Sequence, residues 1–173
     1  MKETEVKFRV KDWKEFKRIA KKLRELNAIL LWQGREINCY FDTARRELKD
    51  NSMVLRVRNW KGKESTITLK IDENKKRPRK FKIREELQIK VDNINIAKRI
   101  LENLGFKQWL KYSKNRSHWS LGKIKVEVDH LGKKFFIEIE GSKKDIEKTA
   151  KLLGLSWTQS TTKSYIDLIR ESD

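Results

Sequence analysis

The sequence has little of several residue types, and each scarcity excludes a class of protein. Among its 173 residues the only cysteine is Cys39, so no disulfide can form within the chain, as expected in a reducing compartment. No apolar run is long enough for a membrane-spanning helix. The charged opening segment MKETEVKF lacks the apolar stretch of a signal peptide, so we expect a soluble cytoplasmic protein.

The chain also lacks internal repeats and low-complexity linkers, which favours a single domain over residues 1–173. A chain of this length buries a sizeable hydrophobic core without disulfides. The only histidines, His118 and His130, have no metal-ligand spacing with each other or with Cys39. We therefore expect both histidines to be ordinary polar residues, and Cys39 to be a small core residue.

Positive charge, in contrast, is abundant. The net charge is +18 and 39% of the residues are charged. An imbalance of this size indicates an anionic partner, such as a nucleic acid, a nucleotide, a polyphosphate or an acidic surface.

Most of the chain alternates between polar and apolar residues, which predicts strands, and a few segments have helical spacing. We expect helices beginning after Asp12, Asp92 and Ser142, a helical tail over about 160–171, and a turn at Gln33-Gly34. The expected strands are 3–10, 29–33, 36–43, 52–59, 64–71, 81–91, 106–119, 123–130 and 134–140. Because the connections between strands are short, this is an antiparallel α+β chain.

One face of the expected strands is charged. In Glu3–Lys7 the charged residues stand at every second position, and the pattern recurs in later strands. The helices hold the apolar stripes that cover the opposite faces, for example Ile100, Leu101 and Leu104. A sheet of about eight strands tends to close, so we predict a closed antiparallel eight-stranded β-barrel with helices packed outside and charges inside. Buried charges are costly unless they are paired or bind ions.

The charges are sorted by strand, with acids on some strands and bases on others. The acids are Glu3, Glu5, Glu127, Asp129, Glu138 and Glu140, and the bases are Arg56, Arg58, Lys70, Lys114 and Arg116. Clustered carboxylates suit hard cations such as Mg²⁺ or Mn²⁺, and clustered Arg and Lys suit phosphate oxygens. Together they predict a metal-dependent enzyme with a polyphosphate substrate.

Nine short motifs occur in sequence over nearly the whole chain. They are ETEVK (Glu3–Lys7), YFDT (Tyr40–Thr43), LRVR (Leu55–Arg58), TLK (Thr68–Lys70), REE (Arg84–Glu86), KNR (Lys114–Arg116), VDHLG (Val128–Gly132), FIEIE (Phe136–Glu140) and KSY (Lys163–Tyr165). In these motifs and their order the chain resembles the CYTH family, or triphosphate tunnel metalloenzymes, and most of all its class IV adenylyl cyclase branch. The resemblance implies an eight-stranded barrel that binds a triphosphate.

The resemblance also implies roles for individual residues. Metal ligands would be Glu3, Glu5, Asp129, Glu138 and Glu140. The triphosphate would be held by Lys7, Arg56, Arg58, Lys70, Arg84, Lys114, Arg116 and Lys163. In some hydrolytic members a lysine and a tyrosine form a catalytic dyad, and the matching residues here are Lys7 and Tyr40.

Three functions remain open from the sequence. The first is conversion of ATP to cyclic AMP and pyrophosphate, and the second is hydrolysis of an inorganic, thiamine or nucleoside triphosphate. The third is a non-catalytic module that binds RNA, including its 5′-triphosphate end, or polyphosphate. The basic run 75–84 and the six tryptophans favour this third reading. The sequence does not distinguish a monomer from a homodimer.

Overall fold

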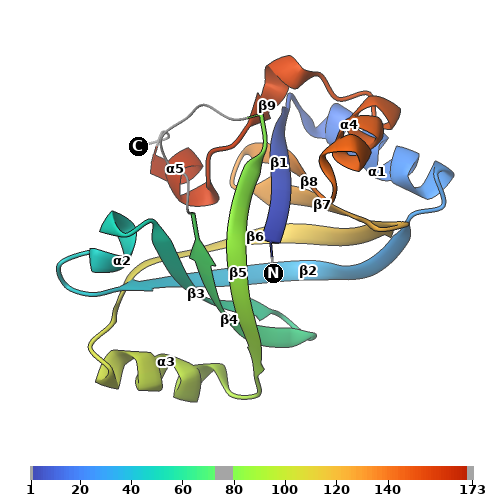
Figure 1. Ribbon diagram of the computed structural model, residues 1–173. Helices are drawn as coiled ribbons and strands as arrows, with labels where there is room; N and C mark the ends of the chain where they lie inside the picture. Colours follow the sequence, from blue (N-terminus) through green and yellow to red (C-terminus); the bar gives the residue numbers. More distant parts are fainter. Residues whose placement is uncertain (1, 73–79, 171–173) are drawn as a thin grey trace. The chain divides into compact units, whose positions relative to one another are not determined.

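The computed structural model describes residues 2–72 and 80–170 (Figure 1). The elements are β1 (Lys2–Val10), α1 (Trp13–Glu25), β2 (Ile29–Asp42), α2 (Glu47–Asp50), β3 (Met53–Trp60), β4 (Glu64–Ile71), β5 (Lys82–Val91), α3 (Ile94–Asn103), β6 (Lys107–Leu121), β7 (Ile124–Leu131), β8 (Lys134–Glu140), α4 (Lys143–Leu152), a 3₁₀ turn (Trp157–Gln159), β9 (Ser160–Thr161) and α5 (Tyr165–Arg170). None of the described helices has both the length and the apolar character needed to cross a bilayer.

The strands are hydrogen-bonded in the order β5-β4-β3-β2-β6-β7-β8-β1-β9, and β5 also pairs with β1. This additional pairing closes the sheet, and the two-residue β9 lies beside β1. The pairs β1–β8, β2–β3, β3–β4, β4–β5 and β7–β8 are antiparallel. A closed antiparallel sheet with helices was the predicted fold, and the strand order confirms it.

The described residues form two compact units. The first comprises 2–3, 32–72 and 83–116, and the second comprises 4–31, 80–82 and 117–170. The expectation of a single domain over residues 1–173 stays a prediction. Of the basic run 75–84, residues 75–79 lie outside the part of the chain that is described.

In the first unit, α3 packs on β3 and β4 (Figure 1). The core between them contains Cys39, Phe41, Leu55, Val57 and Leu101. The strand residues are those that alternate with the charged positions, so the two faces of each strand separate as the sequence indicated. Cys39 is fully buried there, as predicted.

In the second unit, α1 and α4 both contact β8. Ile19 and Leu23 of α1, Ile146 of α4, and Ile137 and Ile139 of β8 have no exposed surface. The apolar stripes of these two helices therefore cover the apolar side of β8, which leaves its charged residues on the other face.

The predicted turn at Gln33-Gly34 is wrong, because β2 continues through both residues. Gly34 is required for packing instead. The Trp32 ring stacks on Trp60 with a centroid distance of 5.0 Å, and a Cβ at position 34 would lie 2.8 Å from that ring. This glycine makes room for an aromatic pair and does not end the strand.

The helix starts agree with the sequence at two of three positions. Asp12 accepts a hydrogen bond from the Glu15 backbone, and Ser142 accepts one from Asp145. For α3 the predicted cap Asp92 is wrong, since Asn93 accepts bonds from the next residues of the helix. A short polar side chain one position later is an equally good cap. The helical tail expected over about 160–171 is helical at α5, residues 165–170, while residues 160–161 form β9 and residue 171 lies outside the described residues.

The predicted packing stripe of α3 is wrong in part. Leu101 is buried, but Ile100 and Leu104 are 54% and 69% exposed, as is Ile96 at 55%. Leu101 and Ala97 face β3 and β4, and the stripe through 96, 100 and 104 lies about a quarter turn away from them around the helix. Helical spacing alone does not tell which of two apolar stripes meets the sheet.

Alanine substitutions at neighbouring positions test this placement. Leu101→Ala removes core contacts and should lower the free energy of unfolding by about 2–4 kcal/mol. Ile100→Ala, its matched control on the exposed stripe, should change it by about 0.5 kcal/mol or less. Denaturant unfolding of both variants measures the difference, and equal losses would contradict the packing described here.

Candidate active site

In the first unit, predicted functional residues are cross-strand neighbours. Tyr40 on β2 lies opposite Arg56 on β3, and Asn38 lies opposite Arg58. Arg56 in turn lies opposite Thr68 on β4. Directly opposite residues in an antiparallel sheet have side chains on the same face, so β2, β3 and β4 present their polar side chains together.

Glu36, a residue that the sequence did not single out, lies at the centre of a group of cations. It is 1% exposed, and its carboxylate oxygens lie 3.4 Å from Arg116 Nη1, 3.5 Å from Lys114 Nζ and 3.9 Å from Arg58 Nε. Burial by itself would raise the pKa of Glu36. The charges of Arg116, Lys114 and Arg56 outweigh burial and hold the pKa well below its ordinary value.

Two neutral donors fix the Glu36 carboxylate in place. Asn38 Nδ2 donates to Oε1 at 2.8 Å, and Trp60 Nε1 donates to Oε2 at 2.6 Å. Trp60 is itself held by its stack on Trp32. With both oxygens engaged, Glu36 is a fixed negative charge among predicted phosphate ligands.

Arg56 is the residue with the clearest need for a further acceptor. Its Nε and Nη2 atoms are buried, and neither has a hydrogen-bond partner among residues 2–72 and 80–170. Burial would lower the pKa of Arg56, but Tyr40 and Glu36 nearby hold it above its ordinary value, so the group stays charged. A buried guanidinium with unused donors is suited to an anion.

Tyr40, the tyrosine of the predicted dyad, forms a pair with Tyr112. Their hydroxyl oxygens are 3.3 Å apart and their rings are stacked at a centroid distance of 5.9 Å. Burial and the neighbouring Tyr40 raise the pKa of Tyr112 well above its ordinary value, so Tyr112 remains protonated at neutral pH.

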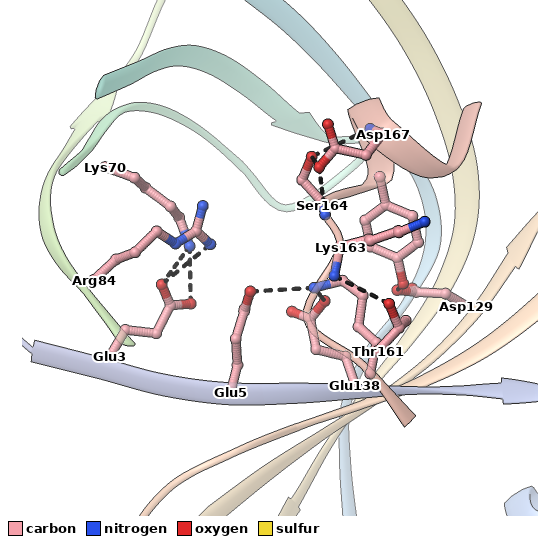
Figure 2. A network of polar contacts seen from close by, with 12 residues as sticks. Glu3, Glu5, Lys70, Arg84, Asp129, Glu138, Thr161, Lys163, Ser164 and Asp167 are labelled. Carbon is pink, nitrogen blue, oxygen red and sulfur yellow. Dashed lines mark hydrogen bonds and ion pairs between the residues drawn. The ribbon is translucent and has the colours of Figure 1, made fainter. Parts of the chain in front are cut away.

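A second ion-paired group in this unit surrounds Glu3. Lys70 Nζ lies 2.8 and 2.6 Å from the two Glu3 oxygens and 2.9 Å from Glu86 Oε2. Arg84 Nη2 is 3.7 Å from Glu3, and Figure 2 shows Lys70 and Arg84 pointing toward the same carboxylate. Burial would raise the pKa of Glu86, but Lys70 lowers it below its ordinary value, so Glu86 stays charged. Glu3, a predicted metal ligand, is thus bound to two predicted phosphate ligands.

In the second unit, Lys7 lies between two predicted metal ligands. Its Nζ is 3.1 Å from Glu5 Oε1 and 2.7 Å from Glu138 Oε2. The register of β1 and β8 explains this, because Lys7 is opposite Glu138 and Glu5 is opposite Glu140. All three side chains of the ion-paired group are largely buried, so each charge requires the others.

The other two predicted metal ligands of this unit have partners as well. Asp129 is fully buried and accepts a hydrogen bond from the Tyr165 hydroxyl. Glu140 forms an ion pair with Lys125 at 2.8 Å, and both side chains are partly exposed. Glu140 is therefore the most accessible of the predicted ligands in β7 and β8.

The remaining predicted residues and the histidines have simpler surroundings. Lys163 is exposed, and its backbone nitrogen donates to Thr161. His118 is not an ordinary surface residue, since it is buried with its Nδ1 3.0 Å from Glu127.

The dyad of Lys7 and Tyr40 stays a prediction, because Lys7 belongs to the second unit and Tyr40 to the first.

The carboxylates are chemically suited to a metal, but in the described residues they are paired with cations. No group of three or more His, Cys, Asp or Glu side chains in residues 2–72 and 80–170 is arranged to hold a metal ion. The position between Glu5 and Glu138 does stabilise positive charge, as the Lys7 ammonium there demonstrates. Carboxylate oxygens are the ligands that hard divalent cations prefer, so the donor set fits Mg²⁺ or Mn²⁺.

Comparison with known families agrees with the fold and with the motifs. The CYTH domain family matches residues 1–167. The chain belongs to the CYTH family. The family generally contains enzymes of the triphosphatase or cyclase type, which act on triphosphates such as ATP.

Three proteins are similar to this CYTH chain over nearly its whole length. A proposed adenylate cyclase of Methanocaldococcus jannaschii is 25% identical over 96% of this chain and 97% of its own. The structure of a proposed adenylate cyclase of Vibrio parahaemolyticus has a TM-score of 0.82 at 19% identity, with 97% of each chain covered. A proposed adenylyl cyclase of Hippeastrum with a dominant triphosphatase activity has a TM-score of 0.72 at 17% identity, covering 99% of this chain and 96% of its own. The two structures confirm the barrel fold.

The lowered pKa of Glu36 predicts how stability depends on pH. A carboxyl group whose pKa is lower in the folded state stabilises the fold when the pH is above the ordinary pKa of the group, about 4.5. This stabilisation is lost as the pH falls below that value. The unfolding free energy of the wild type should therefore fall steeply below pH 4.5, and Glu36→Gln should show a smaller slope. Denaturant unfolding from pH 7 to pH 3 measures both, and identical slopes would contradict the assignment.

Proposed function

We propose that this CYTH protein is a divalent-metal-dependent enzyme that acts on a triphosphate. The observation that carries the proposal is the Arg56 guanidinium, with two buried nitrogens that have no acceptor in the described part of the chain. Phosphate oxygens are suitable acceptors for a guanidinium, which binds them through two parallel hydrogen bonds. Water could satisfy one donor, but a phosphate group satisfies the charge as well.

The other bases of the first unit support phosphate as the ligand. Arg58, Lys114 and Arg116 lie within 4 Å of Glu36, so three bases gather around one carboxylate. Such a group attracts an anion of several charges more strongly than a monoanion. We assign phosphate binding in this unit to Arg56 and these three bases, together with Lys70 and Arg84.

In the second unit we assign metal binding to carboxylates. Glu5, Glu138 and Glu140 lie on neighbouring strands and would hold Mg²⁺ or Mn²⁺, with Asp129 nearby. Glu3, in the first unit, stays a predicted metal ligand. The metal would neutralise charge on the phosphate oxygens of the substrate. Lys7 holds positive charge between Glu5 and Glu138 and is proposed to bind phosphate as well, and the exposed Lys163 would add a further base.

The first candidate reaction is adenylyl cyclisation. The 3′ oxygen of ATP would attack the α-phosphorus, which forms one oxygen–phosphorus bond, breaks the bond to pyrophosphate and releases the hydroxyl proton. The similarity to the proposed cyclase of Methanocaldococcus jannaschii over nearly the full length of both chains supports this reaction. The bases would stabilise charge on the departing pyrophosphate.

The second candidate reaction is hydrolysis of a triphosphate by water. It is supported by the Hippeastrum protein, which has the same fold and for which triphosphatase activity is dominant. In this reaction Tyr40 with Lys7 would help to deprotonate the attacking water. Both reactions require the same phosphate-binding bases.

Phosphorus NMR of the purified protein with Mn²⁺ or Mg²⁺ tests the function. ATP, thiamine triphosphate and tripolyphosphate are supplied in separate samples. Cyclic AMP with pyrophosphate would establish the cyclase, and orthophosphate would establish the phosphohydrolase and rank its substrates. No turnover of any of the three at several temperatures would contradict the proposed enzyme.

Glu140 offers the sharpest test of the metal assignment. Glu140→Ala should lower metal-dependent turnover about 100-fold or more, because a charge-stabilising ligand is lost, with the fold intact. Its matched control is Lys125→Ala, which breaks the same ion pair but keeps the carboxylate. The control should stay within about fivefold of the wild type, since exposed ion pairs contribute little. Full activity in a folded Glu140→Ala protein would show that the metal-site assignment is wrong.

A further inference from the structure

Glu36 requires an explanation that the proposed chemistry does not give. It is a buried carboxylate in the middle of a group of residues to which we assign phosphate binding. An anion in such a place repels the substrate. A side chain that weakens binding by its charge must contribute something else, because a neutral residue could fill the same space.

The surrounding cations supply the reason. The side chains of Lys114 and Arg116 are 2% and 3% exposed, and that of Arg58 is 14% exposed. Buried cations without a counter-charge repel one another and are expensive to desolvate. Glu36 is a carboxylate that lies within 4 Å of all three.

The contacts of Glu36 also define where these cations lie. Its Oε1 atom is the one near Lys114, and its Oε2 atom is the one near both Arg116 and Arg58. Asn38 and Trp60 hold the two oxygens at 2.8 and 2.6 Å, so the carboxylate cannot turn to follow a moving cation. A fixed anion with separate partners on each oxygen arranges several bases in one geometry.

We propose that Glu36 is a positioning residue, an internal counter-anion that holds Arg58, Lys114 and Arg116 in their phosphate-binding arrangement before substrate binds. This inference rests on the proposed function, because it takes these three bases to be phosphate ligands. Glu36 lowers the affinity for the free polyphosphate by its charge and in return keeps the bases aligned for the reaction. Catalytic groups that are aligned in advance need not reorganise during the reaction.

The competing explanation is that Glu36 only stabilises the fold. Both roles predict that Glu36→Gln is less stable than the wild type, so stability cannot separate them. They differ in what happens to the ligand. A counter-anion shares its cations with the phosphate, so its neutralisation should tighten binding and slow turnover together. If Glu36 only stabilises the fold, its neutralisation should change neither the binding affinity nor the turnover rate of the protein that remains folded.

The experiment measures two quantities in wild type, Glu36→Gln and Asp42→Asn. Calorimetry without divalent cation gives the Kd for tripolyphosphate, and steady-state kinetics with Mn²⁺ gives kcat for the best of the three triphosphates. Asp42 is the matched control, because it is a buried carboxylate on the same strand that accepts bonds from the Leu48 and Lys49 backbone of α2. Asp42→Asn should cost stability with Kd and kcat within about twofold of the wild type.

Glu36→Gln should bind tripolyphosphate about fivefold tighter or more and have a kcat about tenfold lower. Unchanged or weaker binding would overturn the counter-anion role, and tighter binding with unchanged kcat would overturn the positioning role. If the wild type binds tripolyphosphate but turns over no triphosphate, the proposed enzyme fails and the Kd comparison alone decides on the counter-anion. If the wild type does not bind tripolyphosphate, both proposals fail.

A double variant covers the case in which Glu36→Gln does not fold. Glu36→Gln combined with Lys114→Met removes one negative and one positive charge from the same group. If Glu36 balances the cations, this variant should fold and melt closer to the wild type than Glu36→Gln does. If the double variant is no more stable than Glu36→Gln, or if neither folds while Asp42→Asn does, charge balance is not the role of Glu36.

Discussion

The need to compensate buried charge governs the polar surroundings of Glu3, Lys7 and Glu36 in this protein. Closure of the antiparallel sheet buries charged residues that an open sheet would expose to water. Each unit meets this cost with its own ion pairs, around Glu36 and Glu3 in the first and around Lys7 in the second. A substrate with several negative charges, together with a bound cation, would compensate the same buried charges. The charged residues whose burial is costly are therefore the residues to which we assign substrate and metal binding, and the proposed function follows from that constraint.

Much of the fold follows from the alternation of charged and apolar residues, since that pattern assigns each strand residue to a face. The failures have local causes. Gly34 was interpreted as a turn, although it accommodates the ring of Trp32 within a continuous strand. Asn93 replaced Asp92 as a cap because either side chain can accept the first backbone bonds. The exposure of Ile100 depends on which stripe of α3 meets the sheet, and this is decided by packing and not by helical spacing.

The sequence predicted which types of residue form the candidate site, but not which of them form ion pairs with each other. Sequence patterns correctly placed Arg56 and Arg58 on one face. Glu36 was missed although it lies in the predicted strand 36–43 and alternates with Asn38, because none of the motifs contains it. Charges sorted by strand suggested that carboxylates gather around a metal. In the described residues they pair with bases on neighbouring strands, as Glu138 does with Lys7. The charge of a residue is visible in a sequence, but its pairing depends on strand register.

The most direct test of the account is calorimetric titration with the bis-methylene analogue of tripolyphosphate, which cannot be hydrolysed at its bridges, in the presence and absence of Mn²⁺. Binding of one analogue per chain, with a tighter Kd when Mn²⁺ is present, is the predicted result, because bases and carboxylates would then act on one phosphate–metal ligand. Weak binding of several molecules per chain that Mn²⁺ does not strengthen, and that salt abolishes, would contradict it. Such a result would leave a basic surface with general affinity for anions.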